Sequence, residues 1–451
     1  MPPSSSAPQR TLRAVEWLNF FLADVQTGLG PFLAAYLAAS GWNPARVGYA
    51  LTFGGLTTVA LQTPAGALVD AARRKRMLVA ASLGLLVLGA FLLSGPLHPS
   101  TVYLAQLFIG GAGPFLGPSV AAITLGIVGA KGFDKQFGRN QAFNAAGNAF
   151  AALLVAYVSF RAGYHAIFTV VMVLTIPTAL LLAAIDGKQI SYARARGAAR
   201  DGEKPKTEGV LALARDRVLV LFLVCAFLFH LANAAMLPQL GEMLARGKPN
   251  EAAPFMSACV IVTQLIITIS AAWIGRRAES NGRKPLLLLG FGVLPIRGVL
   301  YIVAHATSAL IAIQILDGVA NAIFGIVSIL VIKDRTEGTG RFNLASGALA
   351  TMVGIGAALS NSVGGAIVQW SGYSASFLGL ASVALVAFLL LWFAVPETHA
   401  GPGAEPSSES LLLHSRFSNP FEDEPGFIHD KGAESRDGGS DLRGGGGAEK
   451  R

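Results

Sequence analysis

Long runs of apolar residues, separated by short polar segments, dominate the chain. Each run is close to or above the roughly 20 helical residues that a ~30 Å hydrocarbon core requires. The pattern predicts twelve membrane-spanning helices, six in each half of the chain. The predicted spans are residues 15–39, 47–68, 77–93, 101–127, 140–160, 165–185, 218–240, 252–274, 285–304, 308–332, 344–368 and 374–395.

The polar segments divide the chain further. Residues 1–13 are rich in Ser and Pro, and residues 397–451 are polar and rich in Gly and Ser, so both are predicted to be disordered tails. Residues 186–217 form a basic cytoplasmic linker, which suits a helix lying along the membrane surface. The linker joins an N-terminal six-helix bundle, residues 14–185, to a C-terminal one, residues 218–396.

Composition places the chain among polytopic helical membrane proteins. Hydrophobic residues make up 53% and charged residues only 14%, and the charges cluster between the apolar runs. The net charge of +9 does not indicate a nucleic-acid partner, because no basic patch interleaved with aromatic residues occurs. The two cysteines lie in different apolar runs without metal-ligand spacing, so neither a metal nor a cofactor is predicted.

The distribution of Lys and Arg predicts how the chain is inserted. Basic residues concentrate in the loops that follow even-numbered spans, for example residues 73–76 and 276–284, and are sparse in the opposite loops. Because cytoplasmic loops carry the excess of Lys and Arg, both termini are predicted to be cytoplasmic. We expect a multi-pass monomer in the plasma (inner) membrane.

Two charged segments recur at a fixed spacing. Each follows the end of a long apolar run, where a glycine allows close approach of a neighbouring helix. Matching positions are 209 residues apart, with Gly66, Asp70, Arg74 and Lys75 in one segment and Gly275, Glu279, Arg283 and Lys284 in the other. Such repetition at half-chain distance indicates an internal duplication. Because an even number of spans separates the copies, both halves insert the same way up.

These segments resemble the loop signature of the major facilitator superfamily of transporters, Gly-x-x-x-Asp-x-x-Gly-Arg-Lys. The second copy fits with Glu279 in place of Asp, and the first departs at Arg73, where the family usually has Gly. The resemblance covers residues 15–396 and is closest in general look to bacterial-type efflux members. It implies two parallel six-helix repeats, a substrate site near the midplane between them, and gating by the two loops on the cytoplasmic side.

Polar side chains inside the predicted spans are the candidates for substrate binding or ion coupling. An ionisable group in hydrocarbon costs at least ~2.5 kcal/mol on insertion scales, so each one requires a function or a partner. Asp24 and His230 lie on duplicate-related spans and could face each other, although a structural bond or simple core packing would also account for them. Amides can alternatively join helices. The candidates are Asp24, Gln26, Asn144, Asn148, His230, Asn233, Asp317 and Asn321.

Arg297 and Asp317 are predicted to form an intramembrane ion pair. Arg297 lies ~18 Å from the cytoplasmic end of its span, and Asp317 lies ~14 Å from the opposite end of the next span. In a ~30 Å core these depths nearly coincide. The resemblance implies that the span of Asp317 lines the central cavity and that Arg297 neutralises it.

The predicted function is secondary active transport of a small solute by alternating access. The sequence contains no Gly-x4-Gly-Lys-Ser/Thr phosphate loop and no motif of a membrane enzyme, so neither ATP-driven pumping nor catalysis is expected. We predict an ion- or proton-coupled exporter. Because Gln106 stands where proton-coupled relatives often have Arg, Asp24 or Asp317 would carry the proton, or coupling is absent. The alternatives are an uptake symporter for a sugar or organic acid, and a non-transporting sensor or scaffold.

Overall fold

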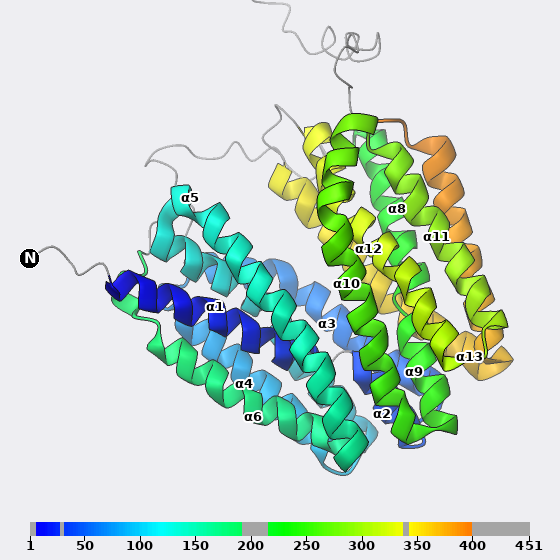
Figure 1. Ribbon diagram of the computed structural model, residues 1–451, viewed down its shortest axis with the longest axis horizontal. Helices are drawn as coiled ribbons and strands as arrows, with labels where there is room; N and C mark the ends of the chain where they lie inside the picture. The colour runs from blue at the N-terminus through cyan, green and yellow to red at the C-terminus, as the bar shows by residue number, and fades with distance from the viewer. Residues whose placement is uncertain (1–5, 28–30, 192–214, 337–341, 399–451) are drawn as a thin grey trace, which may run out of the picture. The chain divides into compact units, whose positions relative to one another are not determined.

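The computed structural model describes residues 6–27, 31–191, 215–336 and 342–398, and this part of the chain is almost entirely α-helical (Figure 1). The helices are α1 (Ser6–Thr27), α2 (Pro31–Ala39), α3 (Pro44–Ala71), α4 (Lys75–Ser94), α5 (Pro99–Ala162), α6 (His165–Ala184), the 3₁₀ helix η1 (Gly187–Gln189), α8 (Arg217–Asn233), α9 (Met236–Gly247), α10 (Pro249–Asn281), α11 (Lys284–Val303), α12 (Thr307–Thr336) and α13 (Phe342–Ala394). The surface-helix prediction for the linker and most of the C-terminal tail lie outside the described residues.

Nine helical segments of the described residues are long and apolar enough to cross a membrane. This confirms the predicted all-α polytopic class, whereas the count of twelve stays a prediction. Helices α5 and α13 each run through two predicted spans and bend at a glycine, Gly129 (φ 69°) in α5 and Gly372 (φ 84°) in α13. Only glycine adopts such a positive φ readily, so these residues set the turns between consecutive spans.

The seventh predicted span is interrupted, which its continuous apolar sequence does not reveal. Helix α8 ends at Asn233 and α9 begins at Met236. At this break the N–H of Ala235 donates to Ser360 Oγ at 2.9 Å, which satisfies a backbone donor at the bend. Helix α1 also begins at Ser6, inside the stretch predicted to be a disordered tail.

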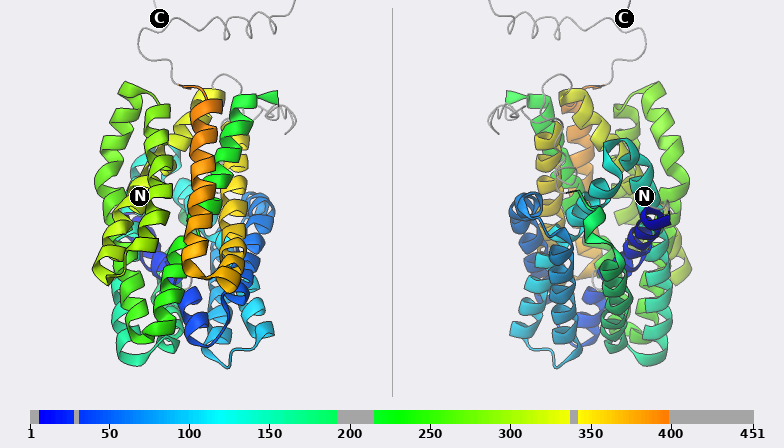
Figure 2. Two further views of the ribbon diagram at one scale, coloured as in Figure 1. Left: turned by 90° about the vertical axis from the view of Figure 1, so that its right-hand side faces the viewer. Right: turned by 90° about the vertical axis from the view of Figure 1, so that its left-hand side faces the viewer.

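Each half of the chain has its own apolar core. One core joins α1, α2 and α3 to α4, α5 and α6, and the other joins α8 to α10–α13. The two side views bring first the green-to-orange helices of the C-terminal half and then the blue-to-cyan helices of the N-terminal half to the front (Figure 2). Four helix pairs make the main contacts between the halves, namely α3 with α13, α2 with α9, α5 with α10 and α2 with α10.

The halves meet most closely where α3 crosses α13. Thr52 Oγ1 donates to Ala358 O at 2.6 Å, and Ser362 Oγ donates to Thr52 Oγ1 at 2.7 Å. Two glycines make this approach possible. A Cβ on Gly365 would lie 2.5 Å from Pro44 O, and one on Gly48 would meet the backbone of α13. Small residues at such crossings let helix backbones touch in a membrane.

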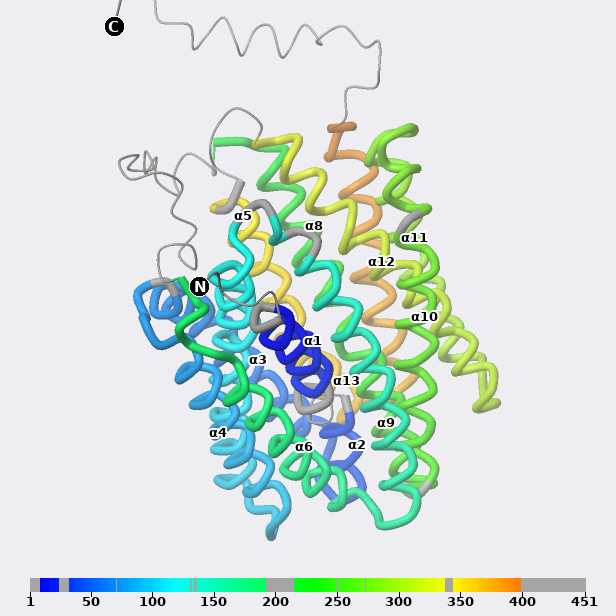
Figure 3. The backbone as a smooth tube through the Cα atoms, turned by 60° about the vertical axis from the view of Figure 1, so that its left-hand side comes forward, coloured from blue at the N-terminus to red at the C-terminus, as the bar shows by residue number. Residues whose placement is uncertain are grey.

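Arg246 in α9 forms a further bridge between the halves. Its Nη2 donates to the carbonyl of Trp42, between α2 and α3, at 2.5 Å, and its Nε donates to Tyr373 Oη in α13 at 3.1 Å. The bridge lies at the end of the bundle where the α2–α3 and α9–α10 connections meet, which Figure 3 shows below the labels α2 and α9.

We expect Arg246→Ala to separate the halves at this end. The bridge is exposed, so the loss should be about 1 kcal/mol or less. Spin labels on R46C and K248C, at exposed positions in the two halves, should therefore show a larger population of long distances in pulsed EPR. Tyr373→Phe is the matched control, because it removes a bond within the C-terminal half and leaves the donation to Trp42. An equal shift in both variants would contradict a role for the bridge itself.

Candidate functional site

A cavity of about 420 Å³ lies between the two halves, near the break between α8 and α9. Helices α2, α3 and α5 line it from the N-terminal half, and α8, α9, α11, α12 and α13 line it from the C-terminal half. Most of its surface is apolar or glycine. Its polar side chains are Thr58, Gln106, Asn233, Arg297, Asp317 and Asn361. A pocket lined by apolar surface with a few convergent polar groups is typical of a small-molecule site.

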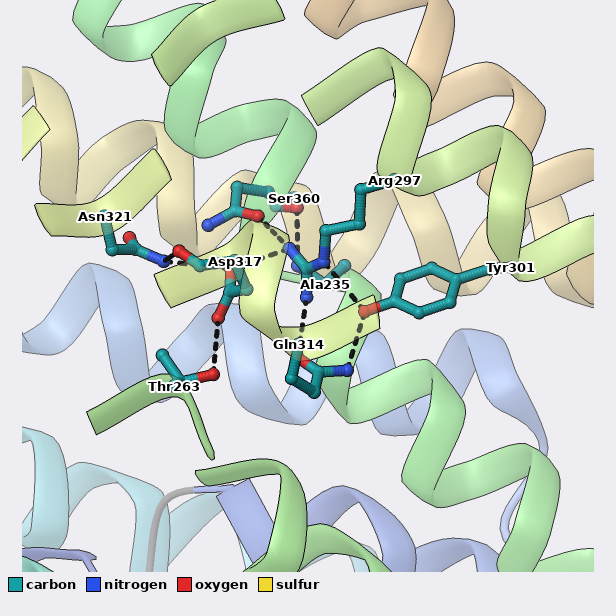
Figure 4. A network of polar contacts seen from close by, with 9 residues as sticks. Ala235, Thr263, Arg297, Tyr301, Gln314, Asp317, Asn321 and Ser360 are labelled. Atoms are coloured by element: carbon teal, nitrogen blue, oxygen red, sulfur yellow. Dashed lines mark hydrogen bonds and ion pairs between the residues drawn. The ribbon is translucent and has the colours of Figure 1, made fainter. Parts of the chain in front are cut away.

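An ion pair borders this cavity (Figure 4). Arg297 Nη1 lies 2.8 Å from Asp317 Oδ1, and the two side chains are 1% and 9% exposed. The same Nη1 donates to Asn233 Oδ1, and Nε of Arg297 donates to Tyr301 Oη at 2.7 Å. The guanidinium thus has an ionic partner, Asp317, and neutral partners in Asn233 and Tyr301. A buried charge that is paired and hydrogen-bonded in this way avoids the penalty of an isolated ion.

Further hydrogen bonds fix the partners of the pair. Gln314 Nε2 donates to Tyr301 Oη at 2.7 Å, and its Oε1 accepts from Arg297 Nη2 at 3.4 Å. Asp317 accepts from Thr263 Oγ1 at 3.2 Å and from Asn321 Nδ2 at 2.9 Å. Both charged groups are therefore held in one orientation, which is the condition for a reproducible binding geometry.

Helical spacing explains how the sequence assembles the network. Arg297 and Tyr301 are one turn apart on α11 and share a face. Gln314, Asp317 and Asn321 follow one another at intervals of three and four along one stripe of α12. Asn233 is the last residue of α8, so the break in that span brings its amide to the cavity. Together with Thr263 of α10, helices α8, α11 and α12 of the C-terminal half thus supply the polar groups of the network.

A sequence model of the Major Facilitator Superfamily matches residues 17–296 and, in a second match, residues 252–428. The chain belongs to the major facilitator superfamily. Two curated relatives, uncharacterized MFS-type transporters from the CDC 1551/Oshkosh and H37Rv strains of Mycobacterium tuberculosis, are each 40% identical over 398 residues. These alignments cover 87% of this chain and 95% of each relative.

Solved transporter structures share the fold. A crystal structure of a mutant of the nucleoside transporter NupG matches with a TM-score of 0.72 at 18% identity, over 85% of this chain and 99% of that one. A structure of a peptide transporter POT mutant with alafosfalin matches with a TM-score of 0.68 at 13% identity, over 84% and 93%. The protein is a membrane transporter of the superfamily and not an enzyme.

The structure brings three of the predicted site residues of this superfamily member together. Asn233 and Asp317 line the cavity, and Asn321 supports Asp317 from the next turn of α12. His230 is instead packed between aromatic rings, with the ring of Phe324 at 4.7 Å, and its Nδ1 lies 3.2 Å from Ala226 O. The side chains of Asp24 and Gln26 lie outside the described residues, so their predicted roles are not addressed.

The predicted amide pair on α5 lies elsewhere. Asn148 Nδ2 donates to Asn144 Oδ1 at 3.2 Å, and Asn144 lines a separate cavity of about 250 Å³ between α1 and α5. Both amides therefore belong to the N-terminal half of the transporter, and neither lines the cavity that includes Arg297 and Asp317. Joining helices, the alternative weighed for them, fits Asn144 Nδ2 lying 3.5 Å from Asn19 O of α1.

The two duplicated loops of this superfamily member make different contacts. In the second, Arg283 Nε binds Asp334 Oδ2 at 3.0 Å and Lys284 Nζ donates to Trp392 O at 2.8 Å. In the first, Lys75 Nζ donates to Val69 O at 2.5 Å. A Cβ on Gly66 or Gly275 would meet nothing within 4 Å, so the expected close approach at these glycines is not found. Glu279 is exposed, Arg74 lies near Met77 Sδ at 3.8 Å, and the Asp70 side chain is outside the described residues.

Several polar residues of the transporter were not singled out from the sequence. Thr263, Tyr301 and Gln314 complete the ion-pair network. Glu16 is buried on α1 and binds Arg139 Nε at 2.9 Å. Glu242 on α9 is 3% exposed, and its Oε2 has no partner among the described residues. Both acids lie near span ends, and a search for ionisable residues there would have found them.

Proposed function

We propose that the protein is a proton-coupled transporter that moves a small solute with an anionic group through the cavity between its halves, by alternating access. The observation that carries this proposal is the Arg297–Asp317 ion pair at the cavity wall. Arg297 is the one cation among the cavity-lining residues of the described chain. A guanidinium is suited to bind a carboxylate or phosphate in a bidentate manner.

The pair provides a physical basis for coupling. In the empty site Arg297 and Asp317 neutralise each other. A proton on Asp317 removes that neutralisation and frees Arg297 to bind an anion. When the proton and the anion are both bound, the charge of Arg297 is again neutralised. With only one of them bound, a charge is left buried and unpaired, which is strongly unfavourable. The carrier can therefore reorient between its outward-open and inward-open conformations only when it is empty or when it holds both the proton and the anion.

This logic supports symport of an anionic solute, which is the uptake alternative weighed from the sequence. Export remains a candidate, because the Asp317 side chain is more exposed than that of Arg297, at 9% against 1%. A solute that binds Asp317 through a cationic or N–H group would compete with the proton, which produces exchange. The structural relatives named as nucleoside and peptide transporters give suitable probe compounds, alongside small carboxylic acids.

The proposal is tested with purified protein in sealed vesicles that contain a pH-sensitive dye. A symported acid should acidify the lumen when it is added outside, and an exchanged solute should make the lumen more alkaline. Vesicles without protein set the baseline. Lack of any solute-dependent pH change, together with solute flux that ignores a pH gradient, would contradict proton coupling.

We expect Asp317→Asn to abolish this proton movement. An asparagine can still accept from Arg297 through Oδ1, which limits the cost of leaving the guanidinium without its counter-ion, and it binds no proton between pH 5 and 8. The dye signal should fall to the level of protein-free vesicles, while the variant still elutes as a folded species. Asn148→Ala is the matched control, because it alters an amide outside the cavity and should leave the signal intact. Proton movement in Asp317→Asn would assign coupling to another residue.

A further inference from the structure

A second cavity of about 670 Å³ lies on the outside of the N-terminal half, between α4 and α6. These helices lie side by side in Figures 1 and 3. Its floor consists of apolar and small residues, including Leu83, Gly84 and Val87 of α4 and Leu182 of α6. At one end it is bordered by four consecutive basic residues, Arg73, Arg74, Lys75 and Arg76.

The length of this groove matches one leaflet of a bilayer. Its lining along α4 extends from Met77 to Val87, which corresponds to about 15 Å at 1.5 Å per residue. Half of a ~30 Å hydrocarbon core has the same depth. The basic residues therefore lie at the level of the lipid headgroups when the apolar floor lies beside the acyl chains.

The cationic rim has capacity for an anion. Arg76 Nη2 donates to Ala183 O at 3.1 Å, but its Nε is buried and has no hydrogen-bond partner among the described residues. Arg74 Nη1 lies 3.8 Å from Met77 Sδ, and a thioether is a weak acceptor. No acidic side chain is among the described residues that line this groove.

The C-terminal half contains a comparable groove without charges. It lies between α11 and α13 and also has a volume of about 670 Å³, with a lining that includes Leu288, Gly292 and Phe388. Helix α11 is the duplicate of α4, and Lys284 is the duplicate of Lys75. Both lysines donate to backbone carbonyls, Lys75 to Val69 O and Lys284 to Trp392 O. The halves differ at the preceding residue, because Arg283, the counterpart of Arg74, is paired with Asp334. An apolar groove is thus present in both halves, and a cationic rim in only the N-terminal one of the described chain.

We propose that the α4–α6 groove binds an anionic phospholipid, with the phosphate at Arg74 and Arg76 and an acyl chain along α4. The apolar floor, its one-leaflet depth and the rim of opposite charge are all complementary to such a lipid. Basic residues next to a membrane attract anionic headgroups, and here the groove adds a binding site for one acyl chain of the lipid.

Native mass spectrometry of the full chain in mild detergent tests this proposal with phosphatidylglycerol and phosphatidylcholine as probes. We expect one phosphatidylglycerol to be retained in preference to phosphatidylcholine. R74Q/R76Q should weaken its retention about 10- to 100-fold. R276Q/R277Q is the matched control, because it removes two exposed cations from the duplicate-related segment without touching the groove. Equal retention of both lipids, equal loss in both variants, or displacement by millimolar inorganic phosphate would overturn the proposal.

A second variant tests whether the acyl chain binds in the apolar part of the groove. A Cβ on Gly84 would meet nothing within 4 Å, so G84L fits the folded protein and fills the groove. Leucine is also a better helix former than glycine, and the lipid-free variant should melt no lower than the wild type. The rise in melting temperature that phosphatidylglycerol causes in the wild type should be lost in G84L. An undiminished rise in G84L would exclude this groove as the site.

Discussion

Replacing Arg297 by alanine should destabilise the transporter by about 3–5 kcal/mol, because the substitution leaves Asp317 charged, buried and without its ionic partner. The network also loses the two hydrogen bonds that Arg297 donates to Tyr301 Oη and to Gln314 Oε1. The expected result is a much lower yield of folded protein and a lower midpoint in a denaturant or thermal unfolding experiment in detergent.

The double variant Arg297→Ala/Asp317→Ala separates stability from function. It removes both charges together, so most of the lost stability should return, while coupled transport should stay at the baseline of empty vesicles. Tyr301→Phe is a milder control that keeps the ion pair. A fully active Arg297→Ala protein would show that the pair has no role in transport.

Gly48→Ala and Gly365→Ala should each slow transport strongly without unfolding either half. The added Cβ meets backbone atoms of the opposite helix, which cannot move aside as a flexible side chain would. Overpacking of this kind costs about 1–3 kcal/mol. Since the contact joins α3 to α13 across the halves, that cost falls on the state in which this end is closed, and the equilibrium should shift by about 5- to 150-fold.

Distances between spin labels on R46C and K248C report this shift. Both native cysteines are buried, so the introduced positions should be labelled selectively. Gly347→Ala provides the matched control, because it lies on the same helix α13 and a Cβ there meets nothing within 4 Å. Unchanged distances and transport in Gly48→Ala would mean that the α3–α13 contact stays closed throughout the cycle or does not limit it.

The sequence predicted the membrane class, the family and the meeting of Arg297 with Asp317. Counting residues from the ends of two adjacent spans was sufficient for the pair, because helical rise converts position into depth. The direction in which a side chain points around the helix axis was harder to predict from the sequence. His230 and Asn233 are three residues apart on α8, yet one packs against Phe324 and the other lines the cavity.

The break in the seventh span was not predictable from hydropathy. Apolar residues continue across this position, and Ala234 and Ala235 keep right-handed helical φ values while the helix is interrupted. The break depends on a tertiary contact, the hydroxyl of Ser360, which lies 125 residues away in the chain. The position of Asn233 at the cavity follows from this break, so a local pattern could not indicate it.

The mutual neutralisation of Arg297 and Asp317 has an electrical consequence. An empty carrier with a neutral pair transfers no net charge when it reorients, and a carrier loaded with one proton and one monovalent anion transfers none either. Moving one elementary charge through 100 mV is worth about 2.3 kcal/mol, and this work is absent from both steps. Uptake by such a cycle is electroneutral, so a concentration difference of protons drives it and the membrane voltage does not.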